Sequence, residues 1–407
     1  MQFTDISRLL EQHKPGFAMA QEFYRDPDIY QVEINEIFMK SWLYAGHVSE
    51  IPNGGDYLLF DFADESVIII RDGEGELHGL LNVCRHRGSR VCLEARGHAN
   101  RLVCPYHAWT YGLDGSLKNA RTMPESFDIA GIGLKKVHLK VLSGMIFINF
   151  MGDPATFKSI EEEMTVCLEP YGLENARVAH RQSYPIDANW KLAVENYSEC
   201  YHCAPAHPEY SRGHSLALPE ARSIEEMAEV MARSQACGLS EKVVDKICLD
   251  AAHFGADCSY ERYPMLRGHV TGSKDGKPVA PLLGSIREFD GGATDFQVGP
   301  VTFALAYCDH VVLYRFTPLS ADKCDCDITW LVNGKAEEGK DYDKADVIWL
   351  WDVTTHADKK IIENNQKGVN SRFYEPGPYS AMEDVTQRFI AWYLDTIKKS
   401  VASAQVH

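Results

Sequence analysis

Two short segments, each with one cysteine and one histidine, constrain this chain more than any other feature. They are Cys84-x-His86 and Cys104-x-x-His107. Two thiolates and two imidazoles can hold a [2Fe–2S] cluster, with both cysteines on one iron and both histidines on the other. Zinc accepts the same ligands, but a zinc finger places its cysteines in one knuckle and its histidines in another. We therefore predict that these four side chains bind an iron–sulfur cluster from two tight loops, with zinc as the alternative.

Short apolar runs separated by turn residues surround the two segments. The runs cover residues 57–60, 67–70, 80–83 and 145–148. Runs of this length that are rich in β-branched and aromatic residues are typical of strands. The Cys-and-His segments thus belong to a small all-β domain, which we expect to cover residues 41–157.

The 407 residues exceed what one hydrophobic core usually organises, so a second domain is expected. After residue 158 the pattern mixes helices at 160–171, 223–237, 358–366 and 383–399 with strands at 301–306, 311–316 and 328–332. Residues 264–284 are rich in Gly, Pro and Lys and indicate a long loop. The predicted fold class is α+β: a small β domain followed by a larger domain, residues 158–407, with an antiparallel sheet covered by helices.

A second group of metal-binding side chains lies in the larger domain. Glu199 and His202 are i, i+3 neighbours on a helix, so the carboxylate can orient the imidazole. His207 would lie on another face of that helix, but Pro205 breaks the helix and lets both histidines point at one ion. A non-haem Fe(II) site needs two histidines and one carboxylate on one face. For the carboxylate we nominate Asp358, at the start of the helix predicted over 358–366.

These residues also have simpler interpretations. Two histidines near a proline often form a surface turn, and Asp358 could be an acid that the helix dipole favours in a first turn. Cys200 and Cys203 flank His202 and could form a redox or zinc pair. No second cysteine pair completes a zinc site and no βαβ pattern surrounds them, which favours iron.

The formal charge of −17 argues against binding to nucleic acid or anionic membranes, because such binding requires clustered Lys and Arg. It suits a cationic substrate or a basic protein partner. The sequence contains neither a signal-peptide pattern nor an apolar run of transmembrane length, so we expect a cytoplasmic protein. It also lacks a Gly-x-Gly-x-x-Gly after a strand, so we find no fingerprint of an NAD(P)H-binding domain in this chain.

With both groups of ligands in this order, the chain resembles the α subunits of Rieske non-haem iron oxygenases over nearly its whole length. The resemblance rests on the two Cys-and-His segments, on Asn196, on Glu199-x-x-His202 and on His207. It implies a [2Fe–2S] Rieske cluster, a mononuclear Fe(II) held by His202, His207 and Asp358, and O2 as co-substrate. It also implies that residues 1–40 form a helical segment packed on the catalytic domain.

The resemblance further implies a homotrimer or a larger homo-oligomer. In such an assembly Glu199 bridges His202 to the partner subunit's His107, and both Glu199 and Asn196 take part in catalysis. A separate flavin and iron–sulfur reductase delivers the electrons of NAD(P)H. Most ring-hydroxylating members carry Asp at the bridging position, so Glu199 resembles the carnitine monooxygenase branch.

The loop at 264–284 is similar to that of the glycine betaine and proline betaine demethylases. The implied reaction is oxidative N-demethylation of a small quaternary ammonium compound, with release of formaldehyde. Proline betaine (stachydrine) or glycine betaine comes first among the substrates and carnitine next. An aromatic-ring hydroxylating dioxygenase or aromatic O-demethylase is the alternative within the family, and an electron carrier or zinc-stabilised interaction module is the alternative outside it.

A permanently cationic substrate needs aromatic faces around it, because each cation–π contact contributes about 0.5–2 kcal/mol. Candidate aromatic side chains are Tyr197, Tyr201, Phe303, Tyr307 and Trp330. Aromatic residues at helix or strand spacing are more often core residues than ligand-binding ones, so each is a separate hypothesis. The carboxylate of a betaine would need a donor, for which the long loop offers Arg267 or His269.

Overall fold

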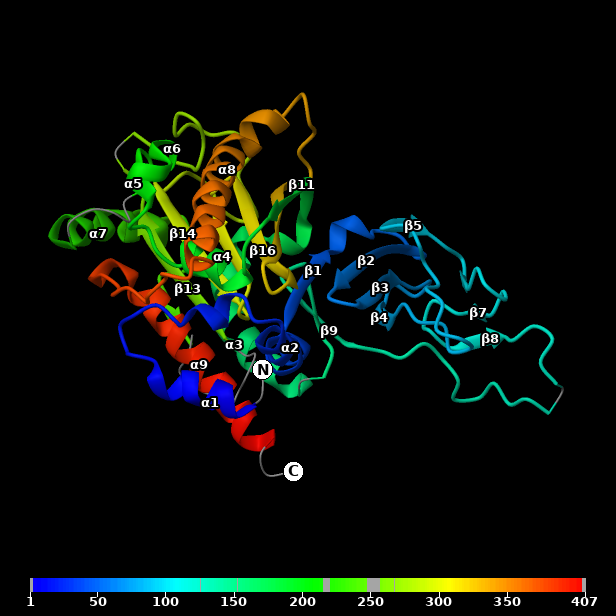
Figure 1. The fold of residues 1–407 in the computed structure, drawn as a ribbon. Coiled ribbons are helices and arrows are strands. Elements are labelled where there is room, and N and C mark those ends of the chain that lie inside the picture. Colours follow the sequence, from blue (N-terminus) through cyan, green and yellow to red (C-terminus); the bar gives the residue numbers. More distant parts are fainter. Residues whose placement is uncertain are drawn as a thin grey trace.

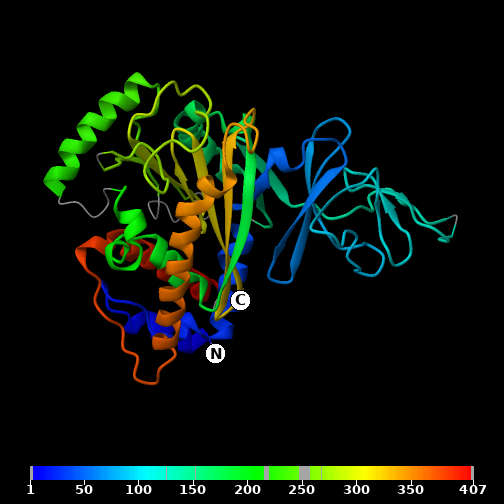
Figure 2. The same ribbon diagram turned by 90° about the horizontal axis from the view of Figure 1, so that it is seen from above.

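A computed structural model describes residues 3–124, 126–151, 153–214, 220–246, 257–266 and 268–404. The chain forms two parts of unequal size, and the small β part extends away from the large part that contains both chain ends (Figure 1). The view from above shows the same separation beyond strand β11 (Figure 2). The predicted α+β fold class, with a small β domain and a larger domain of sheet and helices, is confirmed.

Three small antiparallel sheets build the small β domain, with the orders β1-β10-β9, β4-β3-β2-β5 and β6-β7-β8. The strands are β1 (Leu43–His47), β2 (Asp56–Phe62), β3 (Glu65–Arg71), β4 (Leu77–Leu81), β5 (Arg96–His98), β6 (Leu102–Val103), β7 (Thr110–Tyr111), β8 (Leu117–Asn119), β9 (His138–Leu142) and β10 (Met145–Asn149). Strand β3 is buried on both faces. Val67 and Ile69 pack into the main core, whereas Ile68 and Ile70 pack with Cys84 in a separate core. The same strand therefore supports the first Cys-and-His segment and joins it to the rest of the molecule.

The strands predicted at 57–60, 67–70 and 145–148 lie within β2, β3 and β10. The strand predicted at 80–83 is only partly right, because β4 ends at Leu81. Asn82 leaves the sheet, since its side-chain oxygen accepts the backbone N–H groups of Val91 (2.8 Å) and Cys92 (2.9 Å). This arrangement directs the chain out of β4 and into the first Cys-and-His segment.

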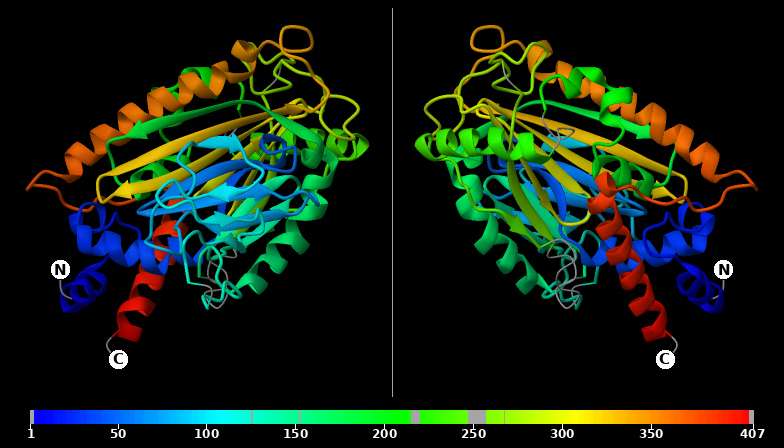
Figure 3. Two further views of the ribbon diagram at one scale, coloured as in Figure 1. Left: turned by 90° about the vertical axis from the view of Figure 1, so that its right-hand side faces the viewer. Right: turned by 90° about the vertical axis from the view of Figure 1, so that its left-hand side faces the viewer.

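A seven-stranded antiparallel sheet of order β11-β17-β16-β15-β14-β13-β12 forms the centre of the larger domain. Its strands are β11 (Ala176–Ile186), β12 (Val244–Asp245), β13 (Cys258–Pro264), β14 (Gly292–Val298), β15 (Thr302–Ala306), β16 (His310–Ser320) and β17 (Lys323–Asn333). Helices α4 (Trp190–Tyr197) and α8 (Lys344–Val369) cover one face and α3 (Phe157–Leu168) the other (Figure 3). Val312 and Tyr314 of β16 pack toward the first face, and Val311 and Leu313 pack toward the second.

Segments from both ends of the chain hold α4 in place. Helices α1 (Phe3–Gln12) and α2 (Pro27–Glu36) pack on α9 (Asp384–Ala404). The buried Glu33 carboxylate pairs with Lys191 at 2.5 Å and accepts hydrogen bonds from Trp190 (2.7 Å) and Tyr393 (2.5 Å). Three donors compensate the cost of burying this charge. The N-terminal segment thereby fixes the start of α4, while the domain boundaries at 40 and 157 stay predictions.

The four predicted helices correspond to α3, α7 (Glu220–Ala236), α8 and α9, and the three predicted strands to β15, β16 and β17. One difference is large: α8 begins at Lys344, where the Asp343 carboxylate accepts the Ala345 N–H at 2.7 Å. Aromatic and β-branched residues between Ile348 and Thr355 obscure the helical pattern, although tertiary packing makes them helical. Asp358 therefore lies in the middle of a helix, and its interpretation as a first-turn acid is wrong.

The long loop predicted at 264–284 contains no helix, and no strand beyond the end of β13, in its described residues. Arg267 falls outside the described part of the chain. Within the ranges that the structure describes, no helix is long and apolar enough to cross a membrane.

Candidate metal centres

The first candidate centre is formed by two loops of the small β domain. Cys84 and His86 follow β4, and Cys104 and His107 lie between β6 and β7. The two cysteines are each 2% exposed, whereas the two histidines are exposed. The imidazole rings of His86 and His107 lie 4.6 Å apart, and the Cys104 thiol is a neighbour of the Cys84 thiol. The structure thus brings all four predicted ligands together, with sulfur inside and imidazoles outside.

Aromatic side chains surround these ligands. The Trp109 ring stacks on His86 at 4.9 Å, and the Tyr106 ring stacks on His107 at 3.9 Å. Tyr111 was not anticipated: its hydroxyl accepts the backbone N–H of Arg85 (3.0 Å) and lies 3.2 Å from the Cys84 sulfur. The hydroxyl proton is therefore free to point at the sulfur, an arrangement that tunes the potential of such a cluster.

The second candidate centre is formed by α4, the turn after it, two short helices and α8. Helix α5 (Cys203–Ala206) and helix α6 (Pro208–Ser211) meet at His207. The Asp358 Oδ1 atom lies 3.2 Å from His202 Nε2 and 3.1 Å from His207 Nε2. Ligands about 2.1 Å from one octahedral ion and at right angles to each other are about 3.0 Å apart. Both distances thus match the spacing of neighbouring ligands on one octahedral ion.

The lack of hydrogen-bond partners around these atoms indicates that they bind a cation. His207 Nδ1 and Nε2 and Asp358 Oδ1 are buried and have no hydrogen-bond partner, although His207 Nε2 and Asp358 Oδ1 lie close together. A buried polar atom without a partner costs about 1–3 kcal/mol. A metal ion between these atoms would satisfy Nε2 and Oδ1 together, so the residues present fit the predicted Fe(II).

The second carboxylate, Glu199, orients His202. One oxygen lies 2.6 Å from His202 Nδ1, and the other accepts the backbone N–H groups of Tyr201 and His202. Burial lowers the pKa of His202, but the Asp358 and Glu199 carboxylates together raise it to about 9. Asn196 Nδ2 lies 3.3 Å from His202 Nε2. Glu199 thus directs Nε2 of His202 toward Asp358, as an outer-sphere carboxylate does for a metal-bound histidine.

Two details of the predicted local structure are wrong. Glu199 and His202 lie in a turn and not on a helix, because α4 ends at Tyr197. Pro205 lies inside the short helix α5, and the break falls at His207, whose φ of −144° and ψ of 79° are not helical. Pro208 causes this break, since a proline disfavours the α conformation of the residue before it.

Cys200 and Cys203 are joined by a disulfide, with their Cα atoms 4.9 Å apart. The pair closes the turn that carries His202. The Cys203 sulfur lies within 4.8 Å of the nitrogen ligands of His202 and His207, but a disulfide sulfur is no thiolate and does not compete for iron. The zinc alternative for this cysteine pair therefore has no support in this oxidised form, whereas the redox alternative stays open.

Aromatic rings form a wall beside the second centre. Tyr197, at the end of α4, stacks on Phe303 of β15 at 4.4 Å and lies 5.3 Å from the Tyr314 ring. The Tyr210 ring lies 5.6 Å from His207 and also 5.6 Å from Trp351 of α8. The sequence analysis missed Tyr210, Tyr314 and Trp351, because only the packing of α6 and α8 on the sheet brings these rings together. We call these five side chains, together with Tyr307, whose ring lies 6.4 Å from the Trp351 ring, the aromatic wall.

The other residues nominated for the substrate site lie in different environments. Tyr307 lies 6.4 Å from Trp351, and its hydroxyl is 2.7 Å from His214 Nε2. Tyr201 is 58% exposed, and Trp330 is fully buried with its ring 5.5 Å from His180. His269 lines a different depression, with Arg233 and Met265. Of the nominated substrate residues, Tyr197, Phe303 and Tyr307 therefore belong to the aromatic wall.

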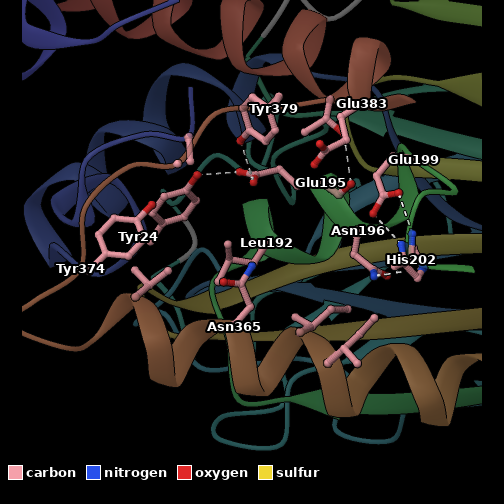
Figure 4. A pocket seen from close by; sticks show the side chains of 16 residues that line it. Tyr24, Leu192, Glu195, Asn196, Glu199, His202, Asn365, Tyr374, Tyr379 and Glu383 are labelled. Atoms are coloured by element: carbon pink, nitrogen blue, oxygen red, sulfur yellow. Dashed lines mark hydrogen bonds and ion pairs between the residues drawn. The ribbon is translucent and has the colours of Figure 1, made fainter. Parts of the chain in front are cut away.

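A cavity of about 360 Å³ lies against Glu199 and His202 (Figure 4). Glu195 sits between its two ends, and its carboxylate accepts hydrogen bonds from the hydroxyl groups of Tyr24 (3.0 Å) and Tyr379 (3.3 Å). Burial raises the pKa of Glu195 to about 7 despite these two donors. The cavity is thus lined by the carboxylate that orients His202 and by a second acid that is partly protonated near neutral pH.

Both candidate centres lie in segments that match the profiles of known protein families. The family profile described as "Rieske [2Fe-2S] domain" matches residues 41–138. The profile described as "Ring hydroxylating alpha subunit (catalytic domain)" matches residues 173–399.

Relatives of known name match the chain over most of its length. The chain is 37% identical over 396 residues to a glycine betaine monooxygenase oxygenase subunit of Chromohalobacter salexigens, covering 96% of this chain and 88% of that protein. The corresponding protein of Pseudomonas aeruginosa is 36% identical over 402 residues, covering 98% and 93%. The carnitine monooxygenase oxygenase subunit of Escherichia coli is 38% identical over 207 residues, which cover 48% of this chain and 54% of that protein.

Solved structures share the fold. A quaternary ammonium Rieske monooxygenase in complex with L-carnitine superimposes with a TM-score of 0.69 at 22% identity, covering 96% of this chain and 97% of that one. Naphthalene 1,2-dioxygenase from Rhodococcus sp. also gives a TM-score of 0.69, at 20% identity, covering 97% and 98%. Because the same fold serves such different substrates, the fold by itself does not distinguish between them.

Proposed function

Because this chain belongs to the Rieske non-haem iron oxygenases, we propose that it is the oxygenase component that removes an N-methyl group from a small quaternary ammonium compound. Glycine betaine and proline betaine are the first candidate substrates and carnitine is the next. The observation that carries the proposal is the contact between an iron ligand, His207, and the aromatic wall, through Tyr210. Full-length similarity to two glycine betaine monooxygenase oxygenase subunits supports the same substrate class.

The proposed chemistry divides between bound groups and side chains. When bound, the Rieske cluster and the mononuclear iron supply the two electrons and the coordination site that O2 activation requires. His202, His207 and Asp358 hold the iron, and Glu199 keeps the His202 ring in place. The aromatic wall holds the ammonium group by cation–π contacts, at about 0.5–2 kcal/mol for each contact. The aromatic wall also keeps water away from the reacting methyl group.

The overall reaction balances with one O2, two electrons and two protons. One oxygen atom enters a C–H bond of the N-methyl group, and the other leaves as water. The C–N bond of the resulting carbinolamine then breaks with loss of the hydroxyl proton, which gives formaldehyde and a tertiary amine that can take up this proton. Because two electrons enter from outside, the reaction needs a separate reductase with flavin and iron–sulfur groups that oxidises NAD(P)H. The names of the relatives, which are oxygenase subunits, support such a partner.

We further propose that electrons pass between copies of the chain in a homotrimer or a larger homo-oligomer. The loop between β6 and β7 lies at the opposite end of the molecule from α5, so the two centres of one chain are far apart (Figure 1). His86 and His107 are exposed, and Glu199 borders a cavity that reaches His202. An exposed cluster loop of one copy can therefore dock beside Glu199 of the next and place the partner subunit's His107 near it.

A formaldehyde-release assay tests the proposed function. The protein, loaded with iron and sulfide and supplied with a compatible reductase, NADH and O2, is given glycine betaine, proline betaine, carnitine and choline in turn. We expect formaldehyde and the demethylated amine in equal amounts from at least one of them. Turnover of benzoate-like aromatic compounds without formaldehyde from any of these cations would favour the aromatic oxygenase alternative. A colourless protein that contains zinc alone would contradict oxygenase activity altogether.

A further inference from the structure

An unpaired carboxylate lies on strand β14 of the large sheet, beneath the segments that carry the predicted iron ligands. Asp295 is in the middle of β14, which Figure 1 shows behind α8 and below α5 and α6. Among the residues that the structure describes, none forms a hydrogen bond or an ion pair with it. Thr294 and Phe296 on either side are buried, at 0% and 1% exposure, whereas Asp295 keeps some accessible surface. Asp295 is thus a partly accessible residue between two buried neighbours.

The sheet register places Asp295 on the face that carries the aromatic wall. Asp295 pairs with Leu305 of β15, so both side chains point to the same side of the sheet. Leu305 packs in the main core together with Phe303, Tyr314 and Trp351. Phe296, next to Asp295, packs in the second core on the opposite face. The carboxylate therefore lies on the side covered by α4 and α8, which lead to the iron ligands.

The charge of Asp295 acts on four tyrosine hydroxyls. Burial is the main cause of the raised pKa of each tyrosine, and the charge of Asp295 raises all four further; they are Tyr197, Tyr210, Tyr263 and Tyr307. Tyr210 is also affected by the charge of Asp358, the iron-ligand carboxylate. The hydroxyls of Tyr197 and Tyr263 have no hydrogen-bond partner. Tyr210 thus lies within electrostatic range of both Asp358 and Asp295.

The charged form of Asp295 is costly in this place unless a cation lies beside it. Burial, with a smaller effect of Glu261 on the adjacent strand, raises the pKa of Asp295 to about 8. The nearest buried arginine on that strand, Arg262, points to the opposite face and binds Asp290 at 2.5 Å. A cation that enters between the aromatic rings would restore the favourable charge balance. Because a quaternary ammonium ion has no N–H donors, it needs only a negative charge and aromatic faces.

We propose that Asp295 recognises the positive charge of the substrate and thereby makes the pocket select quaternary ammonium ions over neutral molecules of the same shape. The inference rests on the proposed function and assigns its charge recognition to one residue. Asp295 also orients a betaine. The carboxylate of the substrate points away from Asp295, because like charges in a pocket of low dielectric repel each other.

The test compares cations with their carbon isosteres. Glycine betaine is matched with 3,3-dimethylbutanoate and choline with 3,3-dimethyl-1-butanol, because each pair differs only in N⁺ against carbon. Binding to the iron-loaded protein is measured by calorimetry. We expect the wild-type protein to prefer the cation of at least one pair by at least about tenfold, which corresponds to about 1.4 kcal/mol. Asp295→Asn should bring that ratio close to one, and with a turned-over substrate it should raise KM far more than it changes kcat.

The matched control is Glu261→Gln, which removes one negative charge from the residue that pairs with Asp295 across the strands. This variant should keep the preference for the cation. The visible spectrum of the cluster and the iron content should be unchanged in both variants. Asp295→Ser, with a smaller neutral side chain, should also bring the ratio close to one. It replaces the Asn variant if that variant does not retain its cluster.

The outcomes separate this inference from the proposed function. If the wild-type protein prefers the cation and both neutral variants keep that preference, the role of Asp295 is refuted and the proposed function is unaffected. If the wild-type protein neither binds these cations nor releases formaldehyde from them, the proposed function fails and this inference fails with it. Loss of the preference in Glu261→Gln to the same extent would assign the effect to the general field of the sheet and would also refute the role of Asp295.

Discussion

The Oδ1 atom of Asp358 lies 3.1 Å from Nε2 of His207, yet neither atom has a hydrogen-bond partner. The two atoms come from a long helix and from the junction of two short ones. Their approach without hydrogen bonding is the arrangement that two ligands of one cation adopt.

Asp358→Ala should abolish binding of the mononuclear iron and leave the cluster intact. Removing the carboxylate leaves two histidines, which are too few to hold Fe(II) in a facial site. Metal analysis should show loss of the non-cluster iron, while the visible spectrum of the cluster stays the same. Asp352→Ala on the same helix is the control, because Asp352 accepts a hydrogen bond from Tyr184 (2.7 Å) and should not affect iron content. Full iron content and activity in the Asp358 variant would remove this residue from the ligand set.

Tyr111→Phe should lower the reduction potential of the Rieske cluster without destroying it. The hydroxyl 3.2 Å from the Cys84 sulfur stabilises the more negative, reduced cluster, so its loss disfavours reduction. The potential is measured by spectroscopic redox titration. Tyr106→Phe is the control, because that ring stacks on His107 and contributes no hydroxyl contact to the sulfur. An unchanged potential would contradict the prediction. His86→Ala, by contrast, should bleach the cluster.

Glu199→Gln should keep most of the iron but reduce product formation by about 10–100-fold, the usual cost of changing a residue that orients a metal ligand. The amide retains an oxygen for the backbone N–H groups of the turn but loses the charge next to His202 Nδ1. Iron content and formaldehyde release are measured on the same preparation. Glu383→Gln serves as the control, since Glu383 lines the same cavity but accepts the Ser380 N–H at 2.7 Å. Equal activity in the two variants would argue against a special role for Glu199.

Glu195→Gln should flatten the dependence of stability on pH. Burial raises the pKa of Glu195 in the folded protein to about 7, above the ordinary value of 4.5 that applies when the chain is unfolded. Between these two values the folded state binds more protons, so the free energy of unfolding falls as pH rises from about 4.5 to about 7. The Gln variant lacks this contribution. Urea unfolding across that range measures the slope, with Glu161→Gln, an exposed residue of α3, as the control. Equal slopes in the wild-type protein and the Glu195 variant would contradict the raised pKa.

Local spacing in the sequence was enough to predict the cysteine and histidine ligands of both groups. Cys84 and His86 lie in one tight loop, and Glu199 and His202 in one turn, so their relative positions depend mainly on a few backbone angles. The α+β fold class followed for a similar reason, because strand and helix patterns are repeated over short distances. The predicted elements were less accurate where tertiary packing overrides local preference, as at the start of α8.

The sequence alone therefore determined which side chains can bind metal, since ligand chemistry belongs to the residue type and its immediate neighbours. Only the tertiary structure decided which distant residues share a site. Asp358 reaches His207 because α8 packs across the sheet, and Tyr210 meets Trp351 because α6 packs against α8. The physical reason is that packing of apolar faces, which no local motif encodes, fixes the approach of segments far apart in the chain.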